Sequence, residues 1–267
     1  MTDQGRAITV KSPEEIHLMF EANQIVAGVL DLLRQRIRPG LTTLKLDRWA
    51  EEYCRDHNAV PAFKGYRGFP GSLCVSLNEQ VVHGIPSKKV VLRTGDIVSI
   101  DFGVKLKGFY GDAALTVPVG KVSPEKEKLM QVTRESLELA IDKVRVGNRV
   151  ADISNAVQTH VEKHGFAVVR QFVGHGIGSD LHESPEIPNY VQKSKSSPRI
   201  LEGMVIAIEP MVNAGTYKVK VLNDNWTVVT ADGKPSAHFE HSIAATSNGP
   251  LVLSALADQE NSVLSGL

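Results

Sequence analysis

The sequence lacks the features that mark secreted, membrane-spanning and nucleic-acid-binding proteins. Its two cysteines, Cys54 and Cys74, are too few for a disulfide framework and lack the spacing of a metal-binding pair. Acidic and basic residues number 30 each, so no bulk charge indicates nucleic acid or an anionic membrane as a partner. Residues 1–10 have no apolar signal-peptide core, and no run approaches the roughly 20 apolar residues of a membrane span. We therefore expect a soluble, cytoplasmic globular protein.

The chain is long enough to bury a substantial core. With 267 residues, 42% of them apolar, it could form one large domain or two small ones. Because no low-complexity linker divides it, we expect a single domain over residues 1–267, with loosely ordered tails at 1–11 and 255–267. The segment from Ser184 to Arg199, rich in Pro, Ser and Lys, is the candidate mobile loop.

Hydrophobic periodicity predicts four helices among several strands. Ser12, Pro13 and Glu15 have the pattern of a capped helix start. The first helix is expected to begin there and to end before Pro39. Three further helices are expected from about residue 43, over 123–144 and over 150–164. The strand-like segments are residues 73–77, 97–104, 109–119, 205–209, 219–222, 227–230 and 239–245.

Parts of the first half of the sequence recur in the second half at nearly the same spacing. Residues 38–47 resemble 145–152, and residues 95–101 resemble 203–209. A looser third match joins the His-Gly-Ile segments at 83–85 and 175–177. Such a repeat predicts two half-domains, each with two helices and a curved antiparallel sheet, around a pseudo-twofold centre.

Five side chains stand in or beside apolar runs where a charge should be costly. Glu209 ends the run that begins at Met204, and Asp101 ends the run that begins at Ile97. An unpaired carboxylate in a core costs several kcal/mol, so a cation must meet these groups. Four carboxylates and one imidazole suit one or two divalent metal ions better than a lone Lys or Arg. The set is Asp101, Asp112, His175, Glu209 and Glu240.

The glycine-rich segment between Asp101 and Asp112 predicts a hairpin with two possible registers. A turn centred on Leu106 and Lys107 would place the two aspartates directly opposite, roughly 5 Å apart at Cβ. A turn at Lys107 and Gly108 would instead pair Asp101 with Ala114, and we expect a bulge to be needed to restore the facing.

Each of these residues also has a simpler explanation in isolation. Asp112 alone could be an exposed turn residue, and a single strand glutamate could be a salt-bridged edge residue. The histidines at 238 and 241 flank Glu240 and could support it or have no role. Three further histidines lie in glycine-rich or turn-like segments, where a histidine can simply bond a backbone carbonyl but where a metal or ligand can also approach the backbone. They are His83, His175 and His182.

The motifs around these residues follow one another in a specific order. They are residues 74–79 with 83–86, 95–101, 108–112, 174–178, 201–210 and 240–241. In them, from about residue 10 to about residue 250, the sequence resembles the type I methionine aminopeptidases. The resemblance implies an α+β pita-bread fold, a pseudo-twofold curved antiparallel sheet with helices on its outer face. It also implies metal-dependent removal of the N-terminal methionine from nascent proteins and peptides, favouring a small second residue.

Carried over by position, the resemblance assigns roles to individual residues. The five side chains listed above become ligands of two divalent metal ions, with Asp101 and Glu240 bridging them. His83 stabilises or protonates the leaving group, and His182 contacts the substrate carbonyl. As a hypothesis, Glu209 accepts the proton of the attacking water. The residues that line the methionine pocket are Tyr66, Phe69, Cys74 and Trp226. Leu181 stands where the bacterial pattern often has an aromatic residue, so we expect a looser pocket floor at this position.

The resemblance also narrows the subclass, the cofactors and the partners. The type II enzymes of the family carry a long insertion between the last histidine and the following glutamate, and the spacing from His182 to Glu209 is too short to hold it. Residues 1–11 hold no zinc-binding cysteines, unlike the extension of the eukaryotic cytosolic type I enzymes. Both observations favour the compact bacterial type. The ions could be Mn, Fe, Co, Ni or Zn, since availability selects among them. The expected partners are the N-terminal methionine of nascent polypeptides and, transiently, the ribosome, with the enzyme a monomer.

Two other functions remain open on the same fold. One is a related exopeptidase of the Xaa-Pro type, and the other is a non-catalytic pita-bread module that binds peptides. Because modules of the second kind usually lose ligand residues, the presence of all five favours an enzyme.

Overall fold

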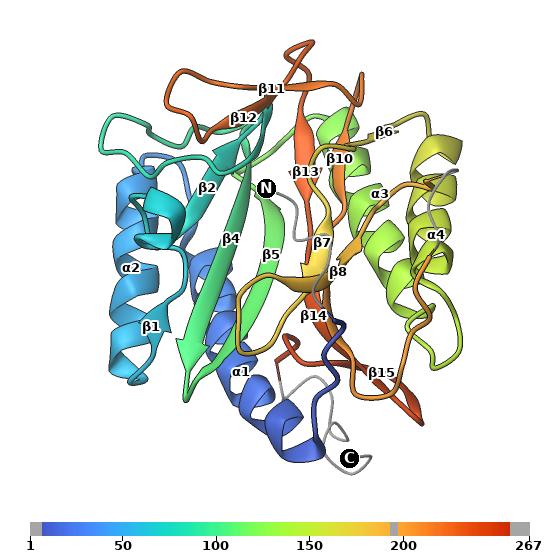
Figure 1. Cartoon of the computed structure of the whole chain (residues 1–267). Coiled ribbons are helices and arrows are strands. Elements are labelled where there is room, and N and C mark those ends of the chain that lie inside the picture. The colour runs from blue at the N-terminus through green and yellow to red at the C-terminus, as the bar shows by residue number, and fades with distance from the viewer. Residues whose placement is uncertain (1–6, 193–196, 257–267) are drawn as a thin grey trace.

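The computed structural model describes residues 7–192 and 197–256, which form an α+β fold of two similar halves (Figure 1). The helices are α1 (Pro13–Arg36), α2 (Thr43–Asp56), α3 (Pro124–Ile141) and α4 (Val150–Lys163), and a short 3-10 turn spans Tyr66–Gly68. The longer strands are β4 (Ile97–Leu106), β5 (Phe109–Pro118), β14 (His241–Thr246) and β8 (Glu183–Ile187). The shorter strands are β1 (Val60–Pro61), β2 (Cys74–Leu77), β3 (Gln80–Val82), β6 (Ala167–Val168), β7 (Gly174–Gly176), β9 (Val205–Ile208), β10 (Met211–Asn213), β11 (Val219–Val221), β12 (Val228–Thr230), β13 (Ser236–His238) and β15 (Gly249–Val252).

All four predicted helices and all seven predicted strands are present. At the start of α1, the Ser12 hydroxyl accepts a hydrogen bond from the Glu15 amide, while the Glu15 carboxylate accepts one from the Ser12 amide, which is the predicted capping box. Helix α3 ends at Ile141, three residues before the predicted end. The strands that the sequence did not predict are mostly two to four residues long, too short for a period to be read.

The predicted repeat is a structural repeat around the starts of α2 and α4. The Gly40 amide donates to the Leu92 carbonyl at 2.9 Å, and the Gly147 amide donates to the Ile200 carbonyl at 3.0 Å. Next to these bonds, isolated β-bridges join Thr42 to residue 91 and Arg149 to residue 199. Strands β4 and β9 both follow a glycine of positive φ, at 95 and 203.

The third match of the repeat is wrong. His83 follows β3 with a φ of +59°, whereas His175 lies inside β7 and pairs with Ala207 of β9. The strand of the first half that pairs with β4 in the same antiparallel sense is β2. The His-Gly-Ile strings therefore occupy different places in the two halves.

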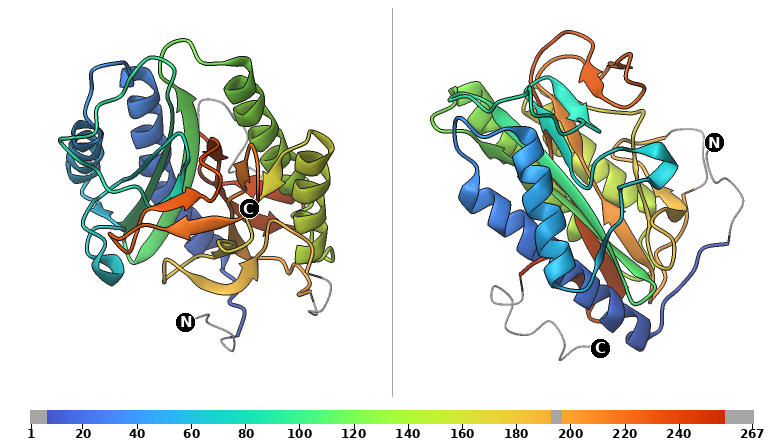
Figure 2. Two further views of the ribbon diagram at one scale, coloured as in Figure 1. Left: turned by 90° about the horizontal axis from the view of Figure 1, so that it is seen from above. Right: turned by 90° about the vertical axis from the view of Figure 1, so that its left-hand side faces the viewer.

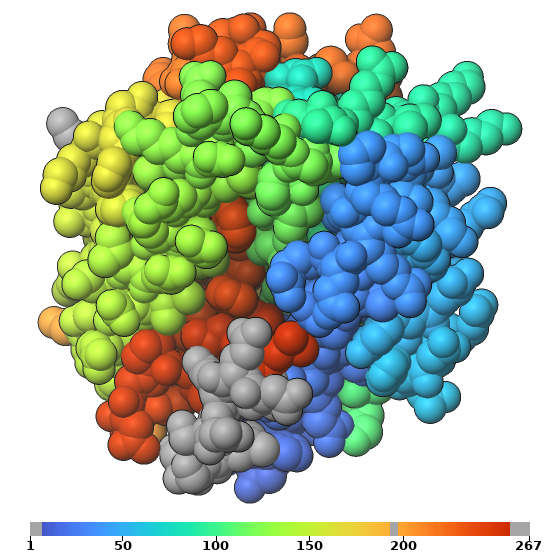
Figure 3. Space-filling view, turned by 180° about the vertical axis from the view of Figure 1, so that it is seen from behind, coloured from blue at the N-terminus to red at the C-terminus, as the bar shows by residue number. Residues whose placement is uncertain are grey.

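Each half buries its sheet beneath its own helices. Helix α1 lies over β4 and β5, and α2 packs beside it against β1 and β2, while α3 and α4 lie over the strands of the second half (Figures 1 and 2). Viewed from behind, the two helix pairs are separated by a furrow in which residues of the C-terminal strands are visible (Figure 3). Burying each large apolar side chain contributes about 1.5–3 kcal/mol, so each half has a substantial core of its own. The first core includes Leu33, Leu46, Ile100 and Phe102, and the second includes Leu129, Ile153, Ile206 and Ile243.

Two sheets meet beside the centre of the molecule. In the first, β1, β4, β2 and β5 pair antiparallel, and in the second the order is β15-β14-β9-β7-β8. They touch through a β-bridge in which the Glu240 amide donates to the Ala114 carbonyl at 2.8 Å. The Thr116 hydroxyl, on the same strand as Ala114, donates to the His238 carbonyl and accepts from the His238 amide.

The predicted mobile loop and tails fall partly on described residues. Residues 184–187 belong to β8, so the loop prediction is wrong there, while residues 193–196 lie outside the described residues. Of the predicted tails, residues 1–6 and 257–267 also lie outside them. Lys11, by contrast, is buried and its Nζ lies 2.5 Å from the Glu183 carboxylate.

Helix α1 corrects the expectation that no segment is apolar enough to span a membrane. By length and mean hydropathy, 24 residues and 1.3, it passes the test for a spanning helix. It is also a core helix, with side chains such as Met19, Val26 and Leu33 fully buried against the sheet. Its apolar character is therefore accounted for by packing.

Candidate metal centre

The structure brings all five predicted metal-binding residues into one cavity of about 160 Å³ between the two halves. Each comes from a different segment of the chain. Asp101 lies on β4, Asp112 on β5 and His175 on β7, while Glu209 follows β9 and Glu240 lies between β13 and β14. The predicted substrate-contacting residues line the same cavity: Tyr66, Phe69, Cys74, His83, Leu181, His182 and Trp226.

The hairpin of β4 and β5 follows the second of the two predicted registers. Lys107 and Gly108 form the turn with φ values of +48° and +90°, and Asp101 pairs with Ala114. The alternative turn, centred on Leu106 and Lys107, is therefore not formed, and because the register is continuous, no bulge brings the two aspartates directly opposite. Since Gly103 pairs with Asp112, Asp101 and Asp112 lie on one face as diagonal neighbours. Side-chain alternation alone brings the two carboxylates together.

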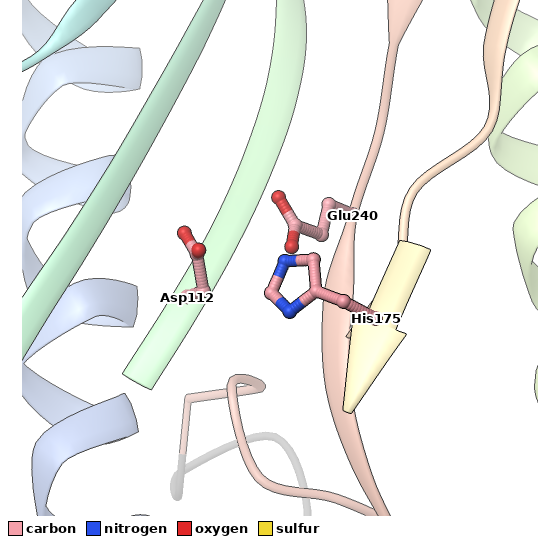
Figure 4. Close-up of side chains that lie close together, drawn as sticks. All are labelled: Asp112, His175 and Glu240. Atoms are coloured by element: carbon pink, nitrogen blue, oxygen red, sulfur yellow. The ribbon is translucent and has the colours of Figure 1, made fainter. Parts of the chain in front are cut away.

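The second half supplies the remaining ligand candidates. His241 pairs with Ile208, so the adjoining residues Glu240 and Glu209 continue the same antiparallel pair towards the cavity. Figure 4 shows Asp112, His175 and Glu240 converging from three segments of the chain. Each offers a ligand atom within 4.8 Å of the others. Such spacing suits ligands around a shared cation.

The ring of His175 is fixed with one nitrogen facing the carboxylates. Its Nδ1 lies 2.9 Å from the Gly176 carbonyl oxygen, so Nδ1 carries the proton and donates. Its Nε2 is then an acceptor, 3.7 Å from Glu209 Oε1. Burial lowers the pKa of His175 to about 4, which keeps the ring neutral at pH 7 and available as a metal ligand.

The carboxylates lie in the cavity with few partners that would stabilise their charge, one being the Ala113 amide, which bonds Asp112. Burial raises the pKa of Asp101 to about 7. Burial, followed by repulsion from neighbouring carboxylates, raises the pKa values of Asp112, Glu209 and Glu240 well above the ordinary range. Among the described side chains, one buried oxygen each of Asp101, Asp112 and Glu240 has no hydrogen-bond partner. The donor set therefore fits divalent cations, which would hold the carboxylates in their ionised form.

The predicted substrate-contacting side chains of the cavity are aromatic or otherwise neutral. The Tyr66 hydroxyl lies 2.9 Å from His182 Nδ1, and the His182 ring also contacts His175, with centroids 4.3 Å apart. His83 makes edge contacts with Trp226 and Phe172. Burial lowers the pKa of His83 to about 4 and, with His175 adding to it, that of His182 to about 3. Both rings are therefore neutral at pH 7.

The two histidines that flank Glu240 both lie outside the cavity. His241 is held by the Ser254 hydroxyl, 2.7 Å from its Nδ1, and does not line the cavity. His238 is buried, and within the described part of the chain its Nε2 has no partner. Neither residue belongs to the group that faces the cavity.

Two lining residues were missed at the sequence level. Phe63 and Arg67 line the cavity beside Tyr66 and Phe69. The only signal for them is the short Gly65–Gly68 segment, whose two glycines frame a tight turn. Nothing in its pattern shows which of its side chains face inward.

Similarity to known proteins extends over nearly the whole chain. The sequence model of metallopeptidase family M24 matches residues 17–247. A methionine aminopeptidase of Clostridium perfringens is 53% identical over 249 residues, covering 93% of this chain and 99% of the relative. Methionine aminopeptidase 1 of Bacillus subtilis is also 53% identical, over 91% of this chain and 97% of its own length.

Solved structures give the same picture. The crystal structure of the methionine aminopeptidase from Thermotoga maritima superposes with a TM-score of 0.91 at 45% identity, covering 93% of this chain and all of that one. The Xaa-Pro dipeptidase from Bacillus anthracis superposes with a TM-score of 0.72 at 24% identity, over 92% of this chain and 61% of that one. The second likeness concerns the fold alone.

Proposed function

The chain belongs to metallopeptidase family M24 and, within it, to the type I methionine aminopeptidases, which remove N-terminal methionine. We propose that the five predicted ligand residues of its cavity hold two divalent metal ions for this reaction. One observation carries the proposal. Four carboxylates share a cavity with a neutral imidazole, and three of their buried oxygens lack a hydrogen-bond partner among the described residues. Asp101, Asp112, His175, Glu209 and Glu240 would hold the ions. Mn, Fe, Co, Ni or Zn would satisfy this set.

Bound there, the two ions would lower the pKa of a water molecule and polarise the scissile carbonyl. Glu209 accepts the proton of that water. It is the part-exposed glutamate of the site, and the Asn189 side chain holds its backbone carbonyl at 3.1 Å. Because their pKa values are lowered, the surrounding histidines are weak proton acceptors, which leaves Glu209, with its raised pKa, as the base in this set.

His182 and His83 act on the substrate as neutral rings. With the Tyr66 hydroxyl as the donor to His182 Nδ1, 2.9 Å away, the proton of His182 is on Nε2, which can then donate to the carbonyl oxygen as negative charge develops on it. His83 stands on the other side of the cavity beside Trp226 and assists the departure of the new amine. Protonated rings would be repelled by the bound ions, which fits their lowered pKa values.

The apolar lining forms the slot for the methionine side chain. Phe69 and Trp226 meet edge to face, with centroids 5.2 Å apart. Burial raises the pKa of Cys74, so its thiol stays neutral and offers a polarisable contact for a thioether. Leu181, only 2% exposed, occupies the floor with less bulk than an aromatic ring. The preference for a small second residue is carried over from the family resemblance.

The remaining elements of the proposal concern the cellular setting. The substrates are N-termini of nascent polypeptides, reached during a transient contact with the ribosome, and the enzyme is a cytoplasmic monomer. Both cysteines are unpaired and buried, as a reducing compartment favours.

Peptide hydrolysis by the chelated and metal-restored protein tests this function. With one or more of the five metals restored, Met-Ala peptides are cleaved after methionine, while Xaa-Pro dipeptides are not. Cleavage of Xaa-Pro instead would assign the related exopeptidase activity. Peptide binding without hydrolysis under every metal would assign a non-catalytic module.

A further inference from the structure

Arg67 is held in a backbone conformation that long side chains rarely adopt. Its φ and ψ of +50° and 21° lie in the left-handed region, between Gly65 and Gly68, which also have positive φ. The turn is closed by hydrogen bonds from the Gly65 amide to the Phe69 carbonyl and from the Phe69 amide to the Tyr66 carbonyl. A disfavoured conformation at the mouth of a site is a reason to ask what the side chain does there.

The side chain of Arg67 belongs to the cavity rim. Its guanidinium carbon lies 5.3 Å from the centroid of the Tyr66 ring, and the hydroxyl of that ring bonds His182. The Arg67 side chain also hydrogen-bonds with Tyr66, and its charge opposes the rise that burial causes in the pKa of Tyr66. Arg67 thus stands one side chain away from a group that we place against the scissile carbonyl.

Arg67 is the one Lys or Arg among the described residues that line the cavity. Nearby cations are engaged elsewhere, since Lys64 pairs with Glu51 and Lys11 with Glu183. No carboxylate among the described residues lies within salt-bridge distance of Arg67, and the residue is exposed. Apart from its hydrogen bond with Tyr66, its remaining donors are available at the opening through which a bound peptide must leave.

We propose that Arg67 is a specificity-determining residue that binds a carboxylate on the third residue of the peptide substrate. The inference rests on the proposed function, in which methionine fills the pocket and the second residue stands at the metal centre. The third residue is then the first to pass the rim. Guanidinium and carboxylate form paired charge-assisted hydrogen bonds, so either an acidic side chain or the terminal carboxylate of a tripeptide would satisfy it.

Three tripeptides separate these sources: Met-Ala-Ser-amide, Met-Ala-Asp-amide and Met-Ala-Ser with a free carboxylate. The wild type should cleave one or both carboxylate peptides with a kcat/KM about two- to five-fold above the neutral amide, mainly through KM, as expected for an exposed ion pair. The ratio should shrink in high salt. A preference confined to one carboxylate peptide identifies the source of the carboxylate and supports the proposal equally.

Arg67→Asn removes the charge while suiting the left-handed backbone, and it should bring both ratios to about one. Arg67→Lys should restore part of the preference. Lys64→Gln, on the same loop but already paired with Glu51, is the matched control and should keep the wild-type ratios. Equal ratios in wild type and Arg67→Asn would overturn the proposal. A wild type that cleaves none of the three peptides with any metal would instead refute the proposed function.

Discussion

At the residue scale, the site is defined by carboxylates whose charge the fold itself does not stabilise. Asp112 illustrates this, because it is 4% exposed, lies diagonally beside Asp101 and has one oxygen without a partner among the described residues. Without a cation, burial and repulsion keep protons on these groups. His175 has the opposite shift for the same reason, and the two effects together favour a metal ion over protons.

Replacing Asp112 by Ala should remove both metal and activity. The variant loses a ligand from the group that Asp112 forms with His175 and Glu240. Loss of a residue that merely supports a ligand typically costs about 10- to 100-fold, so we expect turnover of a Met-Ala peptide to fall by about 100-fold or more. Metal content after dialysis and the rate of hydrolysis are the measurements. Asp142→Ala, on the exposed end of α3, is the control. Full activity in Asp112→Ala would remove this residue from the site.

Replacing His83 by Ala should separate binding of metal from catalysis. His83 touches Trp226 and Phe172 rather than the carboxylate group, so the variant should keep its metal and lose about 10²- to 10⁴-fold in kcat. His57→Ala, at the exposed end of α2, is the control. If metal content fell as far as in Asp112→Ala, His83 would be a ligand instead.

At the scale of elements, strand register and turn geometry decide which side chains meet. Lys107 and Gly108 form a two-residue turn with both φ values positive, and this turn fixes the diagonal relation of Asp101 and Asp112. The seam between the halves matters as much. There, Thr116 bonds both the amide and the carbonyl of His238, two residues from Glu240.

Replacing Thr116 by Val should weaken the seam. The change keeps the shape of the side chain but leaves the buried His238 amide without its acceptor, at a cost of about 1–3 kcal/mol in the free energy of unfolding. Urea denaturation of the metal-free proteins measures it. Thr116→Ser keeps the hydroxyl and should lose less. Equal stability of Thr116→Val and the wild type would show that this bond does not hold the halves together.

The same scale shows what the sequence could and could not predict. Asp101 and Glu209 were found because each ends an apolar run, a signal that survives without coordinates. The register of the hairpin was not, because both turns fit the sequence and only backbone φ distinguishes them. Phe63 and Arg67 were missed because a glycine-framed turn has no periodicity from which an inward face can be read.

At the scale of the whole molecule, a duplicated half places its strand ends at one centre. The repeated starts of α2 and α4 predict the two-fold arrangement correctly, whereas the His-Gly-Ile match does not correspond in space. Short strings can agree by chance, and only those that begin the same helix or strand mark equivalent positions. The arrangement lets four acids from distant segments share one cavity, which neither half could build alone.

Metal titration of the chelated protein, followed by calorimetry at pH 6 and pH 7.5, tests the central claim most directly. The account predicts two ions per chain, bound more weakly at pH 6, because Asp101, with its pKa raised to about 7, and the other raised carboxylates must release protons as metal binds. Asp112→Ala should lose this binding. Failure to bind any divalent ion, or equal binding by Asp112→Ala without proton release, would contradict it.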